Sequence, residues 1–327
     1  MIQVYRGNII ESEHHYHAAV VDHNGNLIDS YGDPDRLIFA RSSMKPFQAI
    51  PLVETGAANH FKYSERELSL SCASHNGELI HRETVLEILN KIGLPEDALK
   101  CGAHIPRDIE SYKEHIRSGK DLTPVFSNCS GKHSGMLATA VYMGEDTDTY
   151  LEISHPVQQR ILHAISDVFE IPIADISLGI DGCGAPAHST PLDKLAFAFA
   201  RLATPISGQT PHAEALKRIS RAMMAHPEMV AGKDRFDTDV MDLTNGKVVA
   251  KAGAEGVQCL GLVDHGIGIA VKIEDGQHRA TSAVVLAILE KLGIELPEFQ
   301  NSKTYQTYRY PVITNTHGDA VGKIVVG

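Results

Sequence analysis

The two ends of this chain are patterned for strands, whereas the long stretch between them is patterned for helices. Three strands are predicted near the start, over residues 2–5, 17–22 and 27–31, with a tight Asn-Gly turn before the third. Four more are predicted near the end, over residues 247–251, 257–263, 267–273 and 323–326. An unpaired strand edge invites aggregation, so neither group can complete a stable sheet alone. We therefore expect one antiparallel sheet built from both chain ends.

The middle of the chain carries the start and stop signals of helices. Ser64 and Glu67 have the spacing of a capping box, and a glycine closes the helix predicted over residues 78–92. Thr190-Pro191 and Thr210-Pro211 have the N-cap-then-proline order that predicts two further helix starts.

Together these patterns predict a single catalytic α/β domain over residues 1–327. Its sheet is expected from about residues 1–35 and 247–327, with one helix over 279–292, and its helical region from about residues 42–241. No repeat and no linker rich in glycine, serine or proline marks a boundary.

Composition excludes several classes of function. Apolar residues make up 43% of the chain and charged residues 22%, which is ordinary for a globular protein. The 30 Lys and Arg against 41 Asp and Glu leave a net charge of -11, which argues against nucleic-acid and membrane partners. No export signal or membrane-spanning run is evident, and five cysteines form no even set for disulfides. We expect a soluble cytoplasmic protein whose thiols are reduced.

The first candidate for chemistry is Ser42 with Lys45, the only Ser-x-x-Lys pattern in the chain. Positions three apart share a helix face, so the hydroxyl and the amine could touch. For Lys45 to act as a base, its pKa must fall from about 10.4 to near 7, which requires burial and a nearby cation. The alternative is a chance occurrence of a short pattern.

Two more candidate residues lie at turns. Ser74 belongs to a run of small and polar residues, 71–78, that opens a helix; its alternative role is to cap that helix. Lys251 leaves a strand at a turn with two glycines and could reach back over a site, although most lysines at turns are simply exposed.

Cys129 and Cys183 lie in two tight glycine-containing segments, 127–135 and 181–186. Two thiolates held by such loops suit two halves of one metal site, for which His133 is the natural third ligand. Alternatively, both cysteines are small buried apolar residues.

These segments together resemble the Rhizobium-type L-asparaginase family, the zinc-containing class 3 enzymes. The resemblance spans most of the chain and rests on five motifs in the family's order, which are RSSMKP at 41–46, SCASHNGE at 71–78, SNCSGKHSG at 127–135, DGCGAP at 181–186 and KAGAEG at 251–256. It implies a fold related to serine β-lactamases and penicillin-binding proteins. It also implies hydrolysis of L-asparagine to L-aspartate and ammonia, and a homodimer.

The resemblance assigns roles to individual residues of this chain. Ser42 with Lys45 and Ser74 with Lys251 match two catalytic Ser-Lys tandems. The residues that match the Zn²⁺ ligands are Cys129, Lys132 and Cys183, so Lys132 replaces His133 as the expected ligand although a lysine must lose its proton to coordinate. The residues expected to orient the substrate are Arg41, His133 and Asp181.

Other functions fit part of the pattern. Ser-x-x-Lys with a later Lys-x-Gly outlines a penicillin-interacting or β-lactamase-like serine hydrolase. A glutaminase-type amidase, a hydrolase in which zinc itself activates water, and a non-enzymatic zinc-dependent amino-acid binder are the further alternatives. Ammonia release from both amides, and the effects of serine replacement and chelation, distinguish them.

Overall fold

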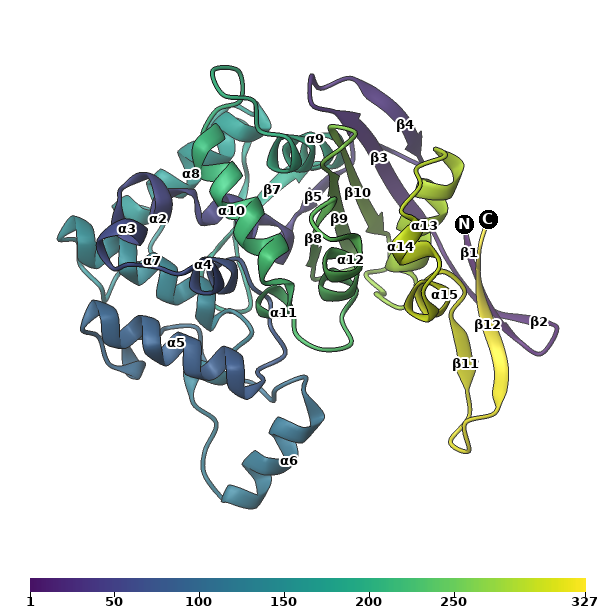
Figure 1. Ribbon diagram of the computed structural model, residues 1–327, viewed down its shortest axis with the longest axis horizontal. Coiled ribbons are helices and arrows are strands. Elements are labelled where there is room, and N and C mark those ends of the chain that lie inside the picture. Colours follow the sequence, from purple (N-terminus) through teal and green to yellow (C-terminus); the bar gives the residue numbers. More distant parts are fainter.

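The computed structural model describes residues 1–327 and confirms the predicted α/β architecture, in which strands from both chain ends pair antiparallel around a helical middle (Figure 1). The paired strands form two sheets rather than one. The first has the order β11 (Val312–Thr314), β12 (Ala320–Val326), β1 (Ile2–Arg6) and β2 (Ile9–His14). The second has the order β4 (Leu27–Tyr31), β3 (Tyr16–Asp22), β10 (Ile267–Ile273), β9 (Val257–Leu262) and β8 (Val248–Gly253).

In both sheets, strands from the two ends of the chain pair directly. Ile2 pairs with Val326 in the first sheet, and His17 pairs with Lys272 in the second. The amino and carboxyl termini consequently lie side by side in Figure 1. The strands β2 and β11 were not predicted, because their short and partly exposed segments lack a regular alternation of apolar residues.

A small third sheet of β5 (Leu37–Phe39), β7 (Pro186–Pro191) and β6 (Leu178–Ile180) was also not predicted. Both helices predicted from Thr190-Pro191 and Thr210-Pro211 are present. Thr190 pairs with Ile38 in the third sheet, so helix α9 begins at Leu192, one residue later than predicted. Helix α10 begins at Ala213, two residues later than predicted.

The helices follow the predicted order through the middle of the chain. They are η1 (Arg41–Met44), α1 (Lys45–Gln48), α2 (Ile50–Glu54), α3 (Ala57–His60), α4 (Glu65–Ser71), α5 (Leu79–Ile92), η2 (Glu96–Ala98), α6 (Ile109–Ser118), η3 (Pro124–Phe126), α7 (Ser130–Met143), α8 (Pro156–Phe169), η4 (Ile173–Asp175), α9 (Leu192–Ala203), α10 (Ala213–Ala225), α11 (Pro227–Val230) and α12 (Phe236–Thr244). Near the carboxyl end follow α13 (Thr281–Lys291), α14 (Pro297–Gln300) and α15 (Lys303–Arg309). None of these helices combines the length and apolar character needed to cross a membrane.

Two of the predicted helix boundaries are confirmed in detail. The side chain of Ser64 accepts from the Glu67 backbone N–H while Glu67 accepts from the Ser64 N–H, which is the predicted capping box. Helix α5 ends at Gly93 with a left-handed φ of 72°, a conformation that glycine adopts without strain.

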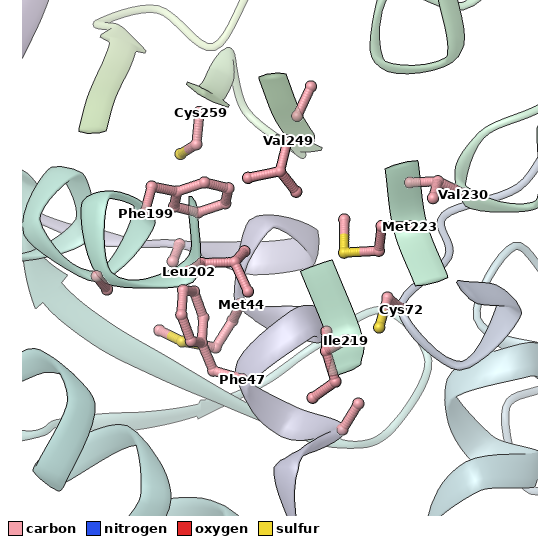
Figure 2. Packing of buried hydrophobic residues seen from close by; sticks show 14 of the residues in the cluster. Met44, Phe47, Cys72, Phe199, Leu202, Ile219, Met223, Val230, Val249 and Cys259 are labelled. Atoms are coloured by element: carbon pink, nitrogen blue, oxygen red, sulfur yellow. The ribbon is translucent and has the colours of Figure 1, made fainter. Parts of the chain in front are cut away.

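The core between the helices and the five-stranded sheet holds the segment η1–α1 in place. The Phe47 ring packs edge-on against Phe169 and Phe199 with centroids 4.8 and 5.6 Å away. Figure 2 shows Met44 and Phe47 among Leu202 and other apolar side chains of this core. The apolar side of η1–α1 is therefore anchored, which fixes the direction of its polar side chains.

Close contact between α9 and the sheet leads to a stability prediction. A Cβ at Gly268 of β10 would lie 1.8 Å from the Ala196 carbonyl oxygen, a backbone atom that cannot move aside cheaply. We expect G268A to lower the free energy of unfolding by about 3 kcal/mol or more, measured by denaturant titration. G182A is the matched control, because its added methyl meets no atom within 4 Å. Equal stability of the two variants would contradict this packing.

Candidate active site

A cavity of about 780 Å³ lies between the end of β8, the segment η1, the loop before α5 and the start of α12. Ser42 and Ser74, from segments 32 positions apart in the chain, both line it. Asn128, which precedes Cys129, lines it as well. The fold therefore brings three of the five sequence motifs to one cavity, and Ala252 to Ala254 bring the fourth.

Ser42 lies in a strained turn. Arg41, directly before it, has a φ of 52°, which a non-glycine residue rarely adopts. Such strain is maintained by surrounding contacts and is common at functional sites. Strand β8 packs closely against this turn at Gly253, where an added Cβ would lie 2.4 Å from the Ala40 carbonyl oxygen. Ser42 itself is 9% exposed and reaches the cavity from this rigid support.

Lys45 is buried and connects the Ser42 turn to the Ser74 loop. Its Nζ donates to the carbonyl oxygen of Ala73 at 2.5 Å, and no side-chain hydrogen bond joins it to Ser42. The backbone N–H of Ser74 donates to the carbonyl oxygen of Val230 at 2.9 Å. The Lys45 amine is thus held beside the residue that precedes Ser74.

His75 follows Ser74 but serves the surrounding structure. Its Nε2 pairs with Ser130 Oγ at 2.9 Å, its Nδ1 accepts from the Gly77 N–H, and its ring stacks on His81 with centroids 4.7 Å apart. Burial lowers its pKa well below the usual value, so the ring is neutral. The two residues Ser74 and His75 form no Ser-His catalytic pair, as expected from their adjacency.

Lys251 is fully buried on β8 and faces a carboxylate. Its Nζ donates to Ala252 O at 3.0 Å and lies 3.6 Å from Oδ2 of Asp237, which is also buried. Burial lowers the pKa of Lys251 to about 8; Asp237 opposes this shift, whereas the cations Lys45 and Arg235 reinforce it. An amine with such a pKa can hold or release a proton near neutral pH.

Asp237, Arg235 and Arg107 line the same cavity, and the sequence motifs identified none of them. The sequence does contain one indication that Asp237 is buried. It lies on α12 at the spacing of the buried stripe that also contains Val240, Met241 and Thr244. A carboxylate on a buried helix face requires a partner, which here is Lys251.

The two predicted metal-binding segments meet behind this cavity. Lys132 Nζ lies 3.2 Å from Cys183 Sγ, and all three predicted ligands are buried. A hydrogen bond from Cys183 holds the pKa of Cys129 well below its usual value, although burial opposes this, and the ammonium groups of Lys45 and Lys132 add to the effect. The same bond raises the pKa of Cys183. One cysteine is therefore ready to ionise.

Lys132 sits in helix α7, not in the loop that the notably polar segment 127–135 predicts. The helix begins at Ser130, and its Gly131 packs so closely on α4 that a Cβ there would lie 2.2 Å from the Leu70 carbonyl oxygen. Burial lowers the pKa of Lys132, but Cys183, Cys129 and Asp181 raise it above its usual value overall.

The residues predicted to orient the substrate lie around this cluster. Arg41 binds Asp181 through Nε and Nη2 at 2.9 and 2.8 Å, which places the guanidinium between the Ser42 turn and the cysteine segment. His133 is fully buried, with Nδ1 2.6 Å from Tyr150 Oη and Nε2 without a partner. None of the three lines the cavity that contains Ser42 and Ser74.

The chemistry of the cluster fits a zinc ion. No group of three or more His, Cys, Asp or Glu side chains is arranged to hold a metal, so an ion bound between Cys129 and Cys183 would need a different third donor, for which the Lys132 amine is the candidate. This amine lies 3.2 Å from Cys183 Sγ, so the two groups are close enough to contact one ion. Two thiolates with one nitrogen donor are ligands that Zn²⁺ accepts, provided that the lysine gives up its proton.

Comparisons with known proteins identify the family of this chain. The model of the L-asparaginase II family matches residues 2–326. No curated protein sequence matches this chain. The solved structure of Mglu in its tris and glutamate form is similar at 15% identity with a TM-score of 0.41; the match covers 90% of this chain but only 62% of Mglu. A β-lactamase from Mycobacterium bovis is similar at 14% identity with a TM-score of 0.45, over 84% of this chain and 94% of that one.

Proposed function

This chain belongs to the L-asparaginase II family, and we propose that it hydrolyses L-asparagine to L-aspartate and ammonia through an acyl-enzyme. The observation that carries the proposal is that Ser42 and Ser74 line one cavity while Lys45 and Lys251 lie buried beside it. Two hydroxyls with two buried amines suit nucleophilic attack followed by proton relay.

In the proposed reaction, Ser42 Oγ attacks the side-chain amide carbon of asparagine, and the neutral form of the Lys45 amine takes the hydroxyl proton. Ser74 and Lys251 then deliver a proton to the leaving nitrogen, so that ammonia departs and a β-aspartyl ester remains on Ser42. Water activated by the same pair hydrolyses the ester and restores the serine. The Lys251 pKa of about 8 supports this role, because an amine with that pKa can both donate a proton to the leaving nitrogen and accept one from water near neutral pH.

We further propose that Cys129, Lys132 and Cys183 hold a zinc ion, which when bound supplies positive charge next to the site. Arg41 and His133 would orient the α-amino acid end of the substrate, with Asp181 holding Arg41 in place at 2.8 Å. The unpartnered Nε2 of His133 supports this role, because a buried ring nitrogen without a hydrogen bond is costly unless something binds it.

Cytoplasmic location and a homodimer also belong to the proposal. All five cysteines are buried and free, which supports a reducing compartment. Light scattering of the purified protein measures the number of chains per particle, and a monomer would contradict the homodimer.

Ammonia release, measured on L-asparagine and L-glutamine in parallel with turnover of a chromogenic cephalosporin, tests the function. We expect release from asparagine and no turnover of the β-lactam. The two amides differ by one methylene, which is worth about 1 to 3 kcal/mol in a pocket, so the ratio of their kcat/KM values measures the specificity. Cephalosporin turnover without ammonia release would replace the proposal by the β-lactamase alternative.

If Ser42 is the nucleophile and Ser74 relays protons, the two serine variants should differ in whether they form the aspartyl-enzyme. We expect S74A to lower kcat by about a hundredfold, because it removes a proton relay, while an aspartyl adduct still forms on the protein. Intact-mass spectrometry after rapid acid quenching detects that adduct. An adduct on S42A and none on S74A would make Ser74 the nucleophile.

A further inference from the structure

The carboxylate of Asp237 is held by three groups at once. Its Oδ1 accepts from Gln258 Nε2 at 2.8 Å. Its Oδ2 accepts from the Ala252 N–H at 2.8 Å and lies 3.6 Å from Lys251 Nζ. Asp237 and Lys251 are 2% and 0% exposed, so solvent cannot replace these contacts.

The β8–β9 pair builds this arrangement. Ala252 and Gln258 are direct partners in its register, so the backbone donor and the side-chain donor approach Asp237 from neighbouring strands. With both oxygens engaged, the carboxylate cannot rotate away. It therefore presents one fixed oxygen to the buried Lys251 amine, 3.6 Å away, while Asp237 itself lines the cavity.

Asp237 is also the one anion among the groups that face Lys251. Lys45 and Arg235 are cations, from α1 and from the turn before α12. The thiols of Cys72, at the end of α4, and Cys259, on β9, face it too, but burial raises their pKa, for Cys72 to about 12, so both stay neutral. Removing the Asp237 charge would leave Lys251 buried with two cations and no counter-ion.

We propose that Asp237 is a positioning residue for Lys251, which fixes the orientation of the amine and controls the pH at which it loses its proton. The proposal rests on the catalytic role proposed for Lys251. It concerns a residue outside all five sequence motifs, and it assigns Gln258 the task of holding Asp237.

The full-length variant D237N tests the proposal, because asparagine keeps the shape and loses the charge. An opposite charge within about 4 to 6 Å shifts a pKa by about 1 to 3 units, so the Lys251 midpoint should move to lower pH by that amount. Two measurements report it: the pH profile of kcat/KM for asparagine, and the ¹³C NMR titration of lysine Cε resonances, with the Lys251 signal assigned from K251M. A midpoint that stays in place or moves to higher pH overturns the proposal.

D239N is the matched control. Asp239 lies on the same helix and accepts from Tyr308 Oη at 2.7 Å, but it does not line the cavity, so both readouts should match the wild type. A shift in D239N equal to that in D237N would also overturn the proposal. Should D237N lose its cooperative melting transition, D237S removes the same charge from a smaller side chain.

The two readouts keep this proposal separate from the proposed function. If the wild type releases no ammonia, the asparaginase proposal fails, while the NMR titration still shows whether Asp237 sets the Lys251 midpoint. If ammonia is released and the midpoint is unmoved in D237N, only the role of Asp237 fails.

Discussion

Replacing Ser42 by alanine is expected to lower kcat for asparagine hydrolysis by about a thousandfold or more. Loss of the nucleophile removes the acyl-enzyme route, and only binding and electrostatic stabilisation of an uncatalysed attack by water remain. The position of Ser42 is consistent with so large an effect on kcat. Ser42 lines the cavity, and the residue before it, Arg41, has a strained φ of 52°. Coupled ammonia release at saturating asparagine measures it.

Ser43 provides the control for this variant. It lies in the same turn, but its Oγ donates to Ala40 O at 2.7 Å and it does not line the cavity. S43A should cost about 1 kcal/mol of stability through that bond and leave kcat within about tenfold of the wild type. If S42A retained wild-type turnover, a mechanism in which bound metal activates water would replace the serine mechanism.

The second large effect is expected on metal content. Purified in buffer without chelator or oxidant, the wild type should contain about one zinc per chain, and C129S and C183S almost none, because a hydroxyl does not replace a thiolate ligand. In the proposed ligand set each cysteine supplies one of three protein donors, so losing either should weaken binding by a factor of about 100 or more. Elemental analysis by plasma mass spectrometry gives the stoichiometry independently of activity.

C259A is the control for the cysteine variants. Cys259 is buried on β9 among apolar side chains of the core (Figure 2), away from the three predicted ligands, so its replacement should leave the zinc content unchanged. Full zinc occupancy in both C129S and C183S would contradict the ligand set. It would leave the two cysteines as buried packing residues.

The sequence predicted those elements whose signals are local. The capping box of Ser64 and Glu67, the stop at Gly93 and most strands at both ends were found, because caps and alternation depend on residues close in the chain. The third sheet was not found. Its strands β5 and β7 come from segments about 150 residues apart, and their pairing moves the start of the following helix by one residue, to Leu192.

In the candidate site, too, individual residues could be predicted from the sequence, whereas their contacts could not. Ser42, Ser74, Cys129 and Lys251 could be picked out individually, since each belongs to a short pattern of small, polar and thiol side chains. Nothing in those patterns states that Lys45 reaches Ala73, that the substrate-orienting residues lie outside the cavity lining, or that Asp237 faces Lys251.

By itself, then, the sequence determined the α/β class, the pairing of both chain ends and the motifs that resemble one amidohydrolase family. The tertiary structure decided which of the motif residues share a cavity and which charges surround each buried amine. The physical reason is that a pKa depends on burial and on charges within a few ångströms, and these come from segments far apart in the chain. Lys251 illustrates it: burial lowers the pKa of this lysine to about 8, with Asp237 opposing the shift and Lys45 and Arg235 adding to it.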